Sequence, residues 1–149
     1  MIKGFNHTSF TVTDIDRAVR FWTATLGFEA RSVSPRAGDW QARVTGVPGA
    51  ELNVAHLYGY GAHIEFIQYA SGACPAPRIS PSMACAAHIC LEVSGIEETW
   101  KRLIAAGASA QGEVALVDNG PVRGLKAGYL RDPEGILIEL IAVPEPPSP

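Results

Sequence analysis

The chain has 149 residues, of which 47% are hydrophobic and 18% charged, and its net charge at pH 7 is −3. This composition is typical of a globular protein with one substantial core, or with two smaller modules that share a core. The acidic balance argues against the basic surfaces that bind nucleic acids and anionic membranes, so we expect neither as a partner. No run of about 20 apolar residues is present to span a bilayer.

The amino-terminal segment shows no apolar stretch typical of a secretion signal. The three cysteines, Cys74, Cys85 and Cys90, are an odd number and lack the spacing of a zinc knuckle. We therefore expect reduced, mostly buried thiols in a cytoplasmic protein.

The first half of the chain predicts a strand, a helix and further strands. Residues 5–12 alternate in polarity as a half-buried strand does, with His7 on the more polar face. Apolar residues at helical spacing predict a helix from about Ile15, closed by Gly27 in the left-handed conformation. The remaining predicted segments are a strand at 28–33, a breaker at 34–38, strands at 40–47 and 51–58, and a strand at 63–69.

The same order returns in the second half. A strand at 86–93, centred on His88, leads into a helical pattern that Gly107 closes. Strands follow at about 112–117, 127–131 and 136–143, with a turn at 132–135 before the last. We interpret the chain as a single domain of two repeated modules, at 4–70 and 85–143, with a proline-containing linker at 71–84 and a flexible tail at 144–149.

Each module therefore reads β-α-β-β-β, which predicts the α+β class. In both first strands the apolar face can pack on the helix stripe. The mixed-polarity face then becomes the inside of a curved sheet, and His7 and His88 lie on it.

One histidine and one glutamate recur in each half. His7 precedes Glu65 by 58 residues (65 − 7), and His88 precedes Glu139 by 51 (139 − 88). Both glutamates lie in apolar strands that hold no lysine or arginine, and an unpaired buried carboxylate is costly. One divalent ion would satisfy all four side chains. Nitrogen and oxygen donors indicate a transition metal (Zn, Ni, Co, Fe or Mn) and suit calcium or magnesium poorly.

Other polar residues have weaker claims to a site. His63 shares the face of Glu65 and is expected to support a ligand or line the cleft, whereas His56 is interpreted as a surface or core histidine. Glu92 shares a face with His88, but its place near the strand end favours solvent. The alternatives left open are Glu51 as a second acid or base, and Arg43, Arg123 and Lys126 as contacts for an anionic substrate.

These residues and their surroundings resemble the vicinal oxygen chelate superfamily, which includes glyoxalase I, methylmalonyl-CoA epimerase, extradiol dioxygenases and the bleomycin and fosfomycin resistance proteins. The resemblance covers essentially the whole chain. It rests on the segments NHTSFTVTDIDRAVRFWTATLGF, HIEFIQY, AHICLEVSGIEETWKRLIAAG and LRDPEGILIELI. It implies paired βαβββ modules that form an open, mixed, barrel-like cleft around a metal, with the helices outside.

Four intact ligands are similar to the set in glyoxalase I and the epimerase, where a metal polarises a carbonyl or enediolate and a carboxylate moves a proton on the adjacent carbon. The resemblance thus implies a lyase or isomerase of a small molecule, with Glu139 or Glu65 moving the proton, and we favour Glu139. Two alternatives stay open: an iron-dependent extradiol-type ring-cleaving dioxygenase, and a non-catalytic protein that sequesters a small ligand. A homodimer is also implied, with each site inside one chain or shared between two.

Overall fold

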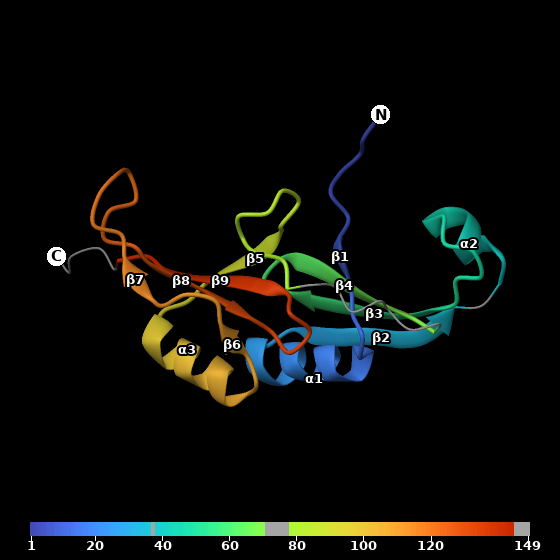
Figure 1. The fold of residues 1–149 in the computed structure, drawn as a ribbon, viewed down its shortest axis with the longest axis horizontal. Helices are drawn as coiled ribbons and strands as arrows, with labels where there is room; N and C mark the ends of the chain where they lie inside the picture. Colours follow the sequence, from blue (N-terminus) through green and yellow to red (C-terminus); the bar gives the residue numbers. More distant parts are fainter. Residues whose placement is uncertain (37, 71–77, 145–149) are drawn as a thin grey trace. The chain divides into compact units, whose positions relative to one another are not determined.

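The computed structural model describes residues 1–36, 38–70 and 78–144 and divides the chain into two compact units, Met1–Pro77 and Arg78–Pro149 (Figure 1). Each unit contains one mixed sheet with a helix packed against it, which confirms the predicted α+β class. The predicted linker lies partly, and the predicted tail almost entirely, outside the described residues. Within the described part of the chain, no helix is both long enough and apolar enough to cross a membrane.

The sheet of unit 1 has the strand order β1-β4-β3-β2, in which β1 runs parallel to β4 and the other neighbours are antiparallel. The two-residue turn Tyr60–Gly61 joins β3 to β4, and its φ values of 53° and 75° are those of a type I′ hairpin. The elements are β1 (Thr8–Thr11), α1 (Ile15–Leu26), β2 (Glu29–Arg36), α2 (Trp40–Thr45), β3 (Leu52–Gly59) and β4 (Ala62–Tyr69).

Helix α1 covers one face of this sheet. It is capped by Asp14, whose side chain accepts the N–H of Arg17, and by the left-handed Gly27 that the sequence predicts. Trp22 of α1 is fully buried and packs edge-on against Phe66 of β4, with ring centroids 5.4 Å apart. Because Phe66 and Glu65 are consecutive in a strand, they point to opposite faces. The helix therefore covers the face that Glu65 does not occupy.

Two predictions in unit 1 are wrong. Residues 40–47 contain the helix α2 rather than a strand; Gly46, with φ of 71°, donates its N–H to Ala42 O and so ends a helical turn. Strand β2 also continues through the predicted breaker to Arg36. Since β2 is the edge strand of its sheet, Pro35 can lie in it opposite Asn53 without disrupting a central ladder.

Unit 2 repeats this plan with shorter strands. The order is β5-β9-β8-β6, with β7 also paired to β8 and β5 parallel to β9. The turn before β9 is as predicted, because the Asp132 carboxylate accepts the N–H groups of Glu134 and Ile136. The predicted strand at 112–117 is reduced to the two-residue β7. The elements are β5 (His88–Glu92), α3 (Ile96–Ala105), β6 (Ser109–Ala110), β7 (Ala115–Leu116), β8 (Lys126–Arg131) and β9 (Leu137–Ala142).

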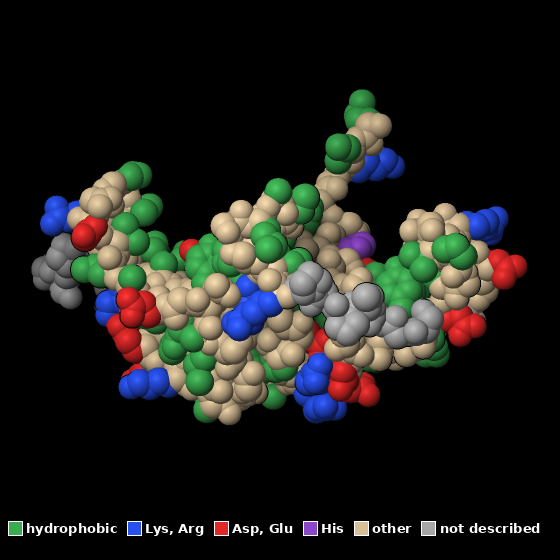
Figure 2. Space-filling view, in the orientation of Figure 1, with side chains coloured by type: hydrophobic (Ala, Val, Ile, Leu, Met, Phe, Trp, Pro, Cys, Tyr) green, Lys and Arg blue, Asp and Glu red, His purple; other side chains and the backbone are tan. Residues whose placement is uncertain are grey.

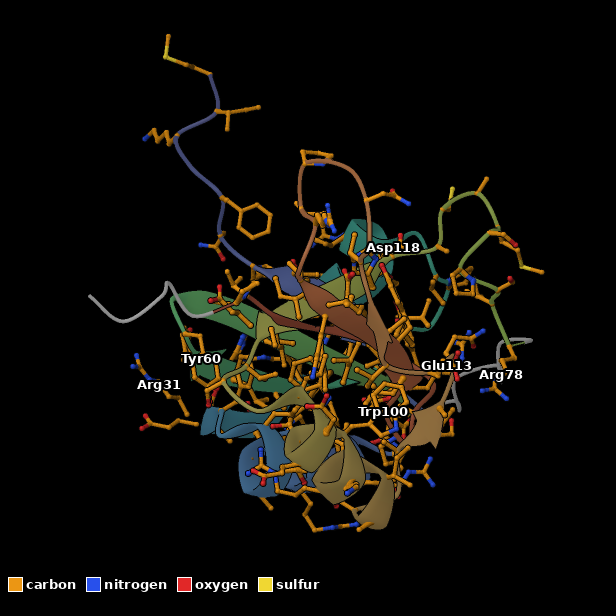
Figure 3. All side chains as sticks on the ribbon, turned by 90° about the vertical axis from the view of Figure 1, so that its left-hand side faces the viewer. Arg31, Tyr60, Arg78, Trp100, Glu113 and Asp118 are labelled. Carbon is orange, nitrogen blue, oxygen red and sulfur yellow. The ribbon has the colours of Figure 1, made fainter. Side chains whose placement is uncertain are left out.

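The contact between α3 and its sheet depends on a glycine. A Cβ atom on Gly128 of β8 would lie 2.9 Å from Trp100 Cζ3 and 3.2 Å from the carbonyl oxygen of Glu113 (Figure 3). The missing side chain thus leaves room for the indole. On the face that Figure 2 shows, basic and acidic side chains occur together within each unit.

The packing at Gly128 yields a stability prediction. We expect Gly128→Ala to lower the free energy of unfolding by about 1–3 kcal/mol, because the added methyl group overlaps Trp100 and cannot be absorbed by the nearby backbone. Gly112→Ala is the matched control, since its Cβ would meet no atom within 4 Å. Chemical denaturation measures both. Equal stability of the two variants would contradict this account of the α3 packing.

Candidate metal centre

The first predicted pair comes together at the open face of unit 1. Strand β4 places Glu65 beside Ser9 of β1 and beside His56 of β3. His7 lies just before β1, two residues from Ser9, and so shares its face. His7 Nε2 is 3.5 Å from Glu65 Oε1, and the Glu65 side chain is only 14% exposed.

The neighbouring Asn6 orients the His7 ring. Its Oδ1 lies 2.7 Å from His7 Nδ1. With the amide oxygen as acceptor, Nδ1 carries the proton and Nε2 presents its lone pair on the side of Glu65. This is the tautomer that a metal ligand needs.

The second predicted pair comes together in unit 2. Strand β9 places Glu139 between Cys90 of β5 and Tyr129 of β8. His88 Nε2 is 3.1 Å from Glu139 Oε2, and the Tyr129 hydroxyl is 3.3 Å from the same nitrogen. The Glu139 side chain is 20% exposed. Each unit thus joins its own histidine to its own glutamate.

The two pairs occupy the same position in the repeated sheet. His7 stands two residues before the parallel neighbour of Glu65, and His88 stands two residues before the parallel neighbour of Glu139. Two donors bound about 2.1 Å from one ion lie about 3.0–3.4 Å apart at coordination angles of about 90–110°. The observed separations of 3.5 and 3.1 Å are close to that range. Each pair is therefore spaced as two ligands of one ion would be.

The four predicted ligands do not form one cluster within a unit. In residues 1–36, 38–70 and 78–144, no group of three or more histidine, cysteine, aspartate or glutamate side chains is arranged to hold a metal ion. The structure brings together two pairs, one in each unit, and the union of both pairs on one ion stays a prediction.

His56 and His63 lie closer to the first pair than their sequence positions indicate. His56 Nδ1 is 3.7 Å from Glu65 Oε2 and 3.0 Å from His63 Nε2. Partial burial lowers the pKa of His56, the charges of His63, Arg36 and His7 lower it further, and only Glu65 opposes them. The His56 imidazole is therefore neutral at pH 7. A two-residue turn at 60–61 sets which residues of β3 and β4 lie opposite each other. Recognising that turn in the sequence would have predicted both contacts.

The weaker candidates do not join either pair. Lys126 forms an exposed ion pair with Glu97 of α3, and none of the described contacts links it to a predicted ligand. The remaining weaker candidates are all exposed to solvent: Glu51, Glu92, Arg43 and Arg123.

The described cysteines are free thiols, but the prediction that they are buried is wrong. Cys85 and Cys90 are both exposed, whereas Cys74 lies outside the described residues. Desolvation by the neighbouring strand atoms, together with the charge and hydrogen bond of Glu139, raises the pKa of Cys90 to about 11. Desolvation and Glu139 also raise the pKa of Tyr129. Both neighbours of Glu139 are therefore protonated at neutral pH.

Comparison with known proteins finds relatives along almost the entire chain. The sequence profile of the Glyoxalase/Bleomycin resistance protein/Dioxygenase superfamily matches residues 4–140. A 2-epi-5-epi-valiolone epimerase from Actinomyces sp is 29% identical over 144 residues, and the match covers 93% of this chain and 79% of the relative.

Solved structures share the fold. A glyoxalase family protein from Bacillus cereus superposes with a TM-score of 0.81 at 24% identity, covering 95% of each chain. The fosfomycin resistance protein FosX from Listeria monocytogenes, solved with Mn(II) and sulfate, gives a TM-score of 0.60 at 20% identity, covering 95% of this chain and 93% of that one. The profile match and the fold together confirm the resemblance drawn from the sequence: the chain belongs to the Glyoxalase/Bleomycin resistance protein/Dioxygenase superfamily.

Proposed function

We propose that the protein is a divalent-metal-dependent isomerase or lyase of the glyoxalase and epimerase type, which transfers a proton on the carbon beside a carbonyl of a small substrate. The observation that carries the proposal is the repeated pair, in which a histidine nitrogen lies 3.5 or 3.1 Å from a glutamate oxygen at the same place in two sheets. The relative from Actinomyces sp, which is named as an epimerase, favours the isomerase form.

The donor set fits a transition metal. His7, Glu65, His88 and Glu139 would hold Zn, Ni, Co, Fe or Mn, because two imidazoles and two carboxylates match the preferences of these ions. The lone pair that Asn6 leaves on His7 Nε2 supports this assignment. When bound, the ion would supply Lewis-acid polarisation of the substrate carbonyl, which acidifies the adjacent C–H bond.

Glu139 is the better placed of the two glutamates to act as the base. The Cys90 thiol and the Tyr129 hydroxyl flank it on the two neighbouring strands, and both stay protonated because their pKa values are raised. As protonated groups they can donate to the carboxylate and do not compete with it for the substrate proton. The hydroxyl of Tyr129 also reaches His88 Nε2. In this proposal the Glu139 carboxylate leaves its ligand position to take the proton from carbon and then returns it.

Solvent deuterium exchange tests the assignment of Glu139. The metal-loaded protein in D₂O should exchange the hydrogen beside the carbonyl in at least one compound of a panel of hydroxyketones, branched acyl thioesters and hemithioacetals. We expect Glu139→Gln, assayed at the same metal content as the wild type, to lower the exchange rate by at least about 100-fold, because an amide cannot accept the proton. Glu92→Gln, which changes an exposed glutamate at the end of β5, should exchange within about two-fold of the wild type.

The same sample separates the alternatives. Exchange at the wild-type rate in Glu139→Gln would overturn the role of Glu139. Exchange with no compound of the panel would overturn the proposed function. Oxygen uptake with catechols would then indicate the ring-cleaving dioxygenase, and tight binding of a small ligand without turnover would indicate the sequestering protein.

The hydrogen bond of Asn6 gives a prediction on metal affinity. Asn6→Ala should weaken metal binding by about 10–100-fold, because His7 loses the acceptor that fixes its tautomer and ring orientation. Asn119→Ala, which removes an exposed amide bonded to Asp118, is the control and should not change the affinity. Competition with a chromophoric chelator measures both. Identical affinities would show that Asn6 does not orient a ligand.

A further inference from the structure

Unit 1 carries polar and aromatic groups that its repeat in unit 2 lacks. The position two residues before Glu65 is His63, whereas the position two residues before Glu139 is Leu137, which is buried. Tyr58 lies opposite His63 across the hairpin of unit 1, and no aromatic residue takes the corresponding place opposite Leu137 in unit 2, which Arg131 occupies. Groups needed to hold the metal occur in both units. The groups found only in unit 1 therefore need another explanation.

These extra groups form a continuous stack across three strands. The Arg31 guanidinium of β2 lies 4.3 Å from the centroid of the Tyr58 ring on β3. The Tyr58 ring is stacked on His63 of β4, with centroids 4.2 Å apart and an interplanar angle of 14°. His63 in turn touches His56, which contacts Glu65. The stack thus runs from the first metal-ligand pair outward to the edge strand.

A groove of about 830 Å³ opens along this stack. Arg31, Tyr58 and His63 all line it. Tyr60 forms another part of its wall and is held in place by a hydrogen bond of 2.9 Å from its hydroxyl to Leu26 O. Figure 3 shows the Arg31 and Tyr60 side chains near each other at this end of unit 1. His63 lines the groove and also contacts His56, which lies beside Glu65. The groove is therefore adjacent to the pair that His7 and Glu65 form.

The chemistry of the groove favours a neutral, hydroxyl-rich ligand. Its lining includes one carboxylate, Glu29, and one guanidinium, Arg31, so it has no excess of positive charge. The Asn6 amide and His63 add groups that can donate or accept hydrogen bonds. An anionic group would meet the Glu29 carboxylate, and a purely apolar ligand would displace water from these polar groups without replacing its hydrogen bonds. Hydroxyl groups, which both donate and accept, match this mixture.

We infer that the groove selects a neutral, polyhydroxylated carbonyl compound as substrate, with His63 and Arg31 as its specificity-determining residues. The inference rests on the proposed function for the reacting carbonyl and adds the class of the substrate. His56 and Tyr58 fix the His63 ring on two sides. Arg31, stacked through its face, keeps N–H groups at its edge for ligand oxygens.

Ligand binding to the zinc-loaded full chain tests the substrate class without turnover. The three probes are scyllo-inosose, a cyclic ketone with five hydroxyls; cyclohexanone, the same ring without them; and dihydroxyacetone phosphate, an anionic hydroxyketone. Saturation-transfer-difference NMR gives the affinity of each. We expect scyllo-inosose to bind at least about ten-fold more tightly than either of the others, because only it pairs the polar groups without adding charge.

Two variants test the residues. His63→Leu introduces the residue that unit 2 has at the equivalent place, and Arg31→Gln removes the guanidinium. Each should weaken scyllo-inosose binding by about ten-fold, the loss of roughly one hydrogen bond. The zinc content of both should stay unchanged, because neither is a proposed ligand. Arg20→Gln, on α1 at the opposite face, should bind as the wild type does. His63→Gln, which keeps a polar group, should recover part of the affinity.

The outcomes separate this inference from the proposed function. Equal or tighter binding of cyclohexanone or of the phosphate would overturn the substrate class, and wild-type affinity in both His63→Leu and Arg31→Gln would overturn the two residues. Deuterium exchange with thioesters or hemithioacetals alone would sustain the proposed function and refute the inference. Selective scyllo-inosose binding without exchange of any panel compound would support the groove as a binding site for polyhydroxylated carbonyl compounds and would refute the proposed function.

Discussion

The structure depends on a carboxylate placed in the middle of an apolar strand. Such a group needs compensation, because burial disfavours its charge. In both sheets the compensation comes from the two flanking strands. The parallel first strand brings a histidine to Glu65 or Glu139, and the antiparallel third strand brings His56 to the former and Tyr129 to the latter. Both sheets therefore give their glutamate a polar neighbour on each flanking strand.

The rest of each unit holds these groups at a polar face. Helix α1 buries Trp22 against the opposite side of its sheet, and α3 brings Trp100 against Gly128. The backbone turns at 60–61 and 132–135 fix which residues face each other across the hairpins. A shift of one residue would move a glutamate into the core. The packing of the helix-covered face of each sheet therefore determines which side chains lie on its polar face.

The sequence sufficed for the features that depend on local pattern. Alternation placed His7 and His88 on the more polar faces of their strands, and the repeat assigned Glu65 to the first and Glu139 to the second. It failed where tertiary context decides: residues 40–45 form the short helix α2, which ends at Gly46, and β2 runs through Pro35 because it lies at an edge. The contacts of His56 and His63 depend on cross-strand register, which polarity alone does not give.

The central claim is that the two pairs bind a metal, and elemental analysis of the purified protein tests it most directly. We expect about one transition-metal atom per chain in the wild type, and loss of that metal in the Glu65→Gln, Glu139→Gln double variant, because amides are poor replacements for carboxylate ligands. The Glu51→Gln, Glu92→Gln double variant removes the same charge from exposed sites and should retain the metal. A wild-type protein that neither copurifies with a transition metal nor binds one on reconstitution would contradict the account, as would full metal content in the Glu65, Glu139 variant.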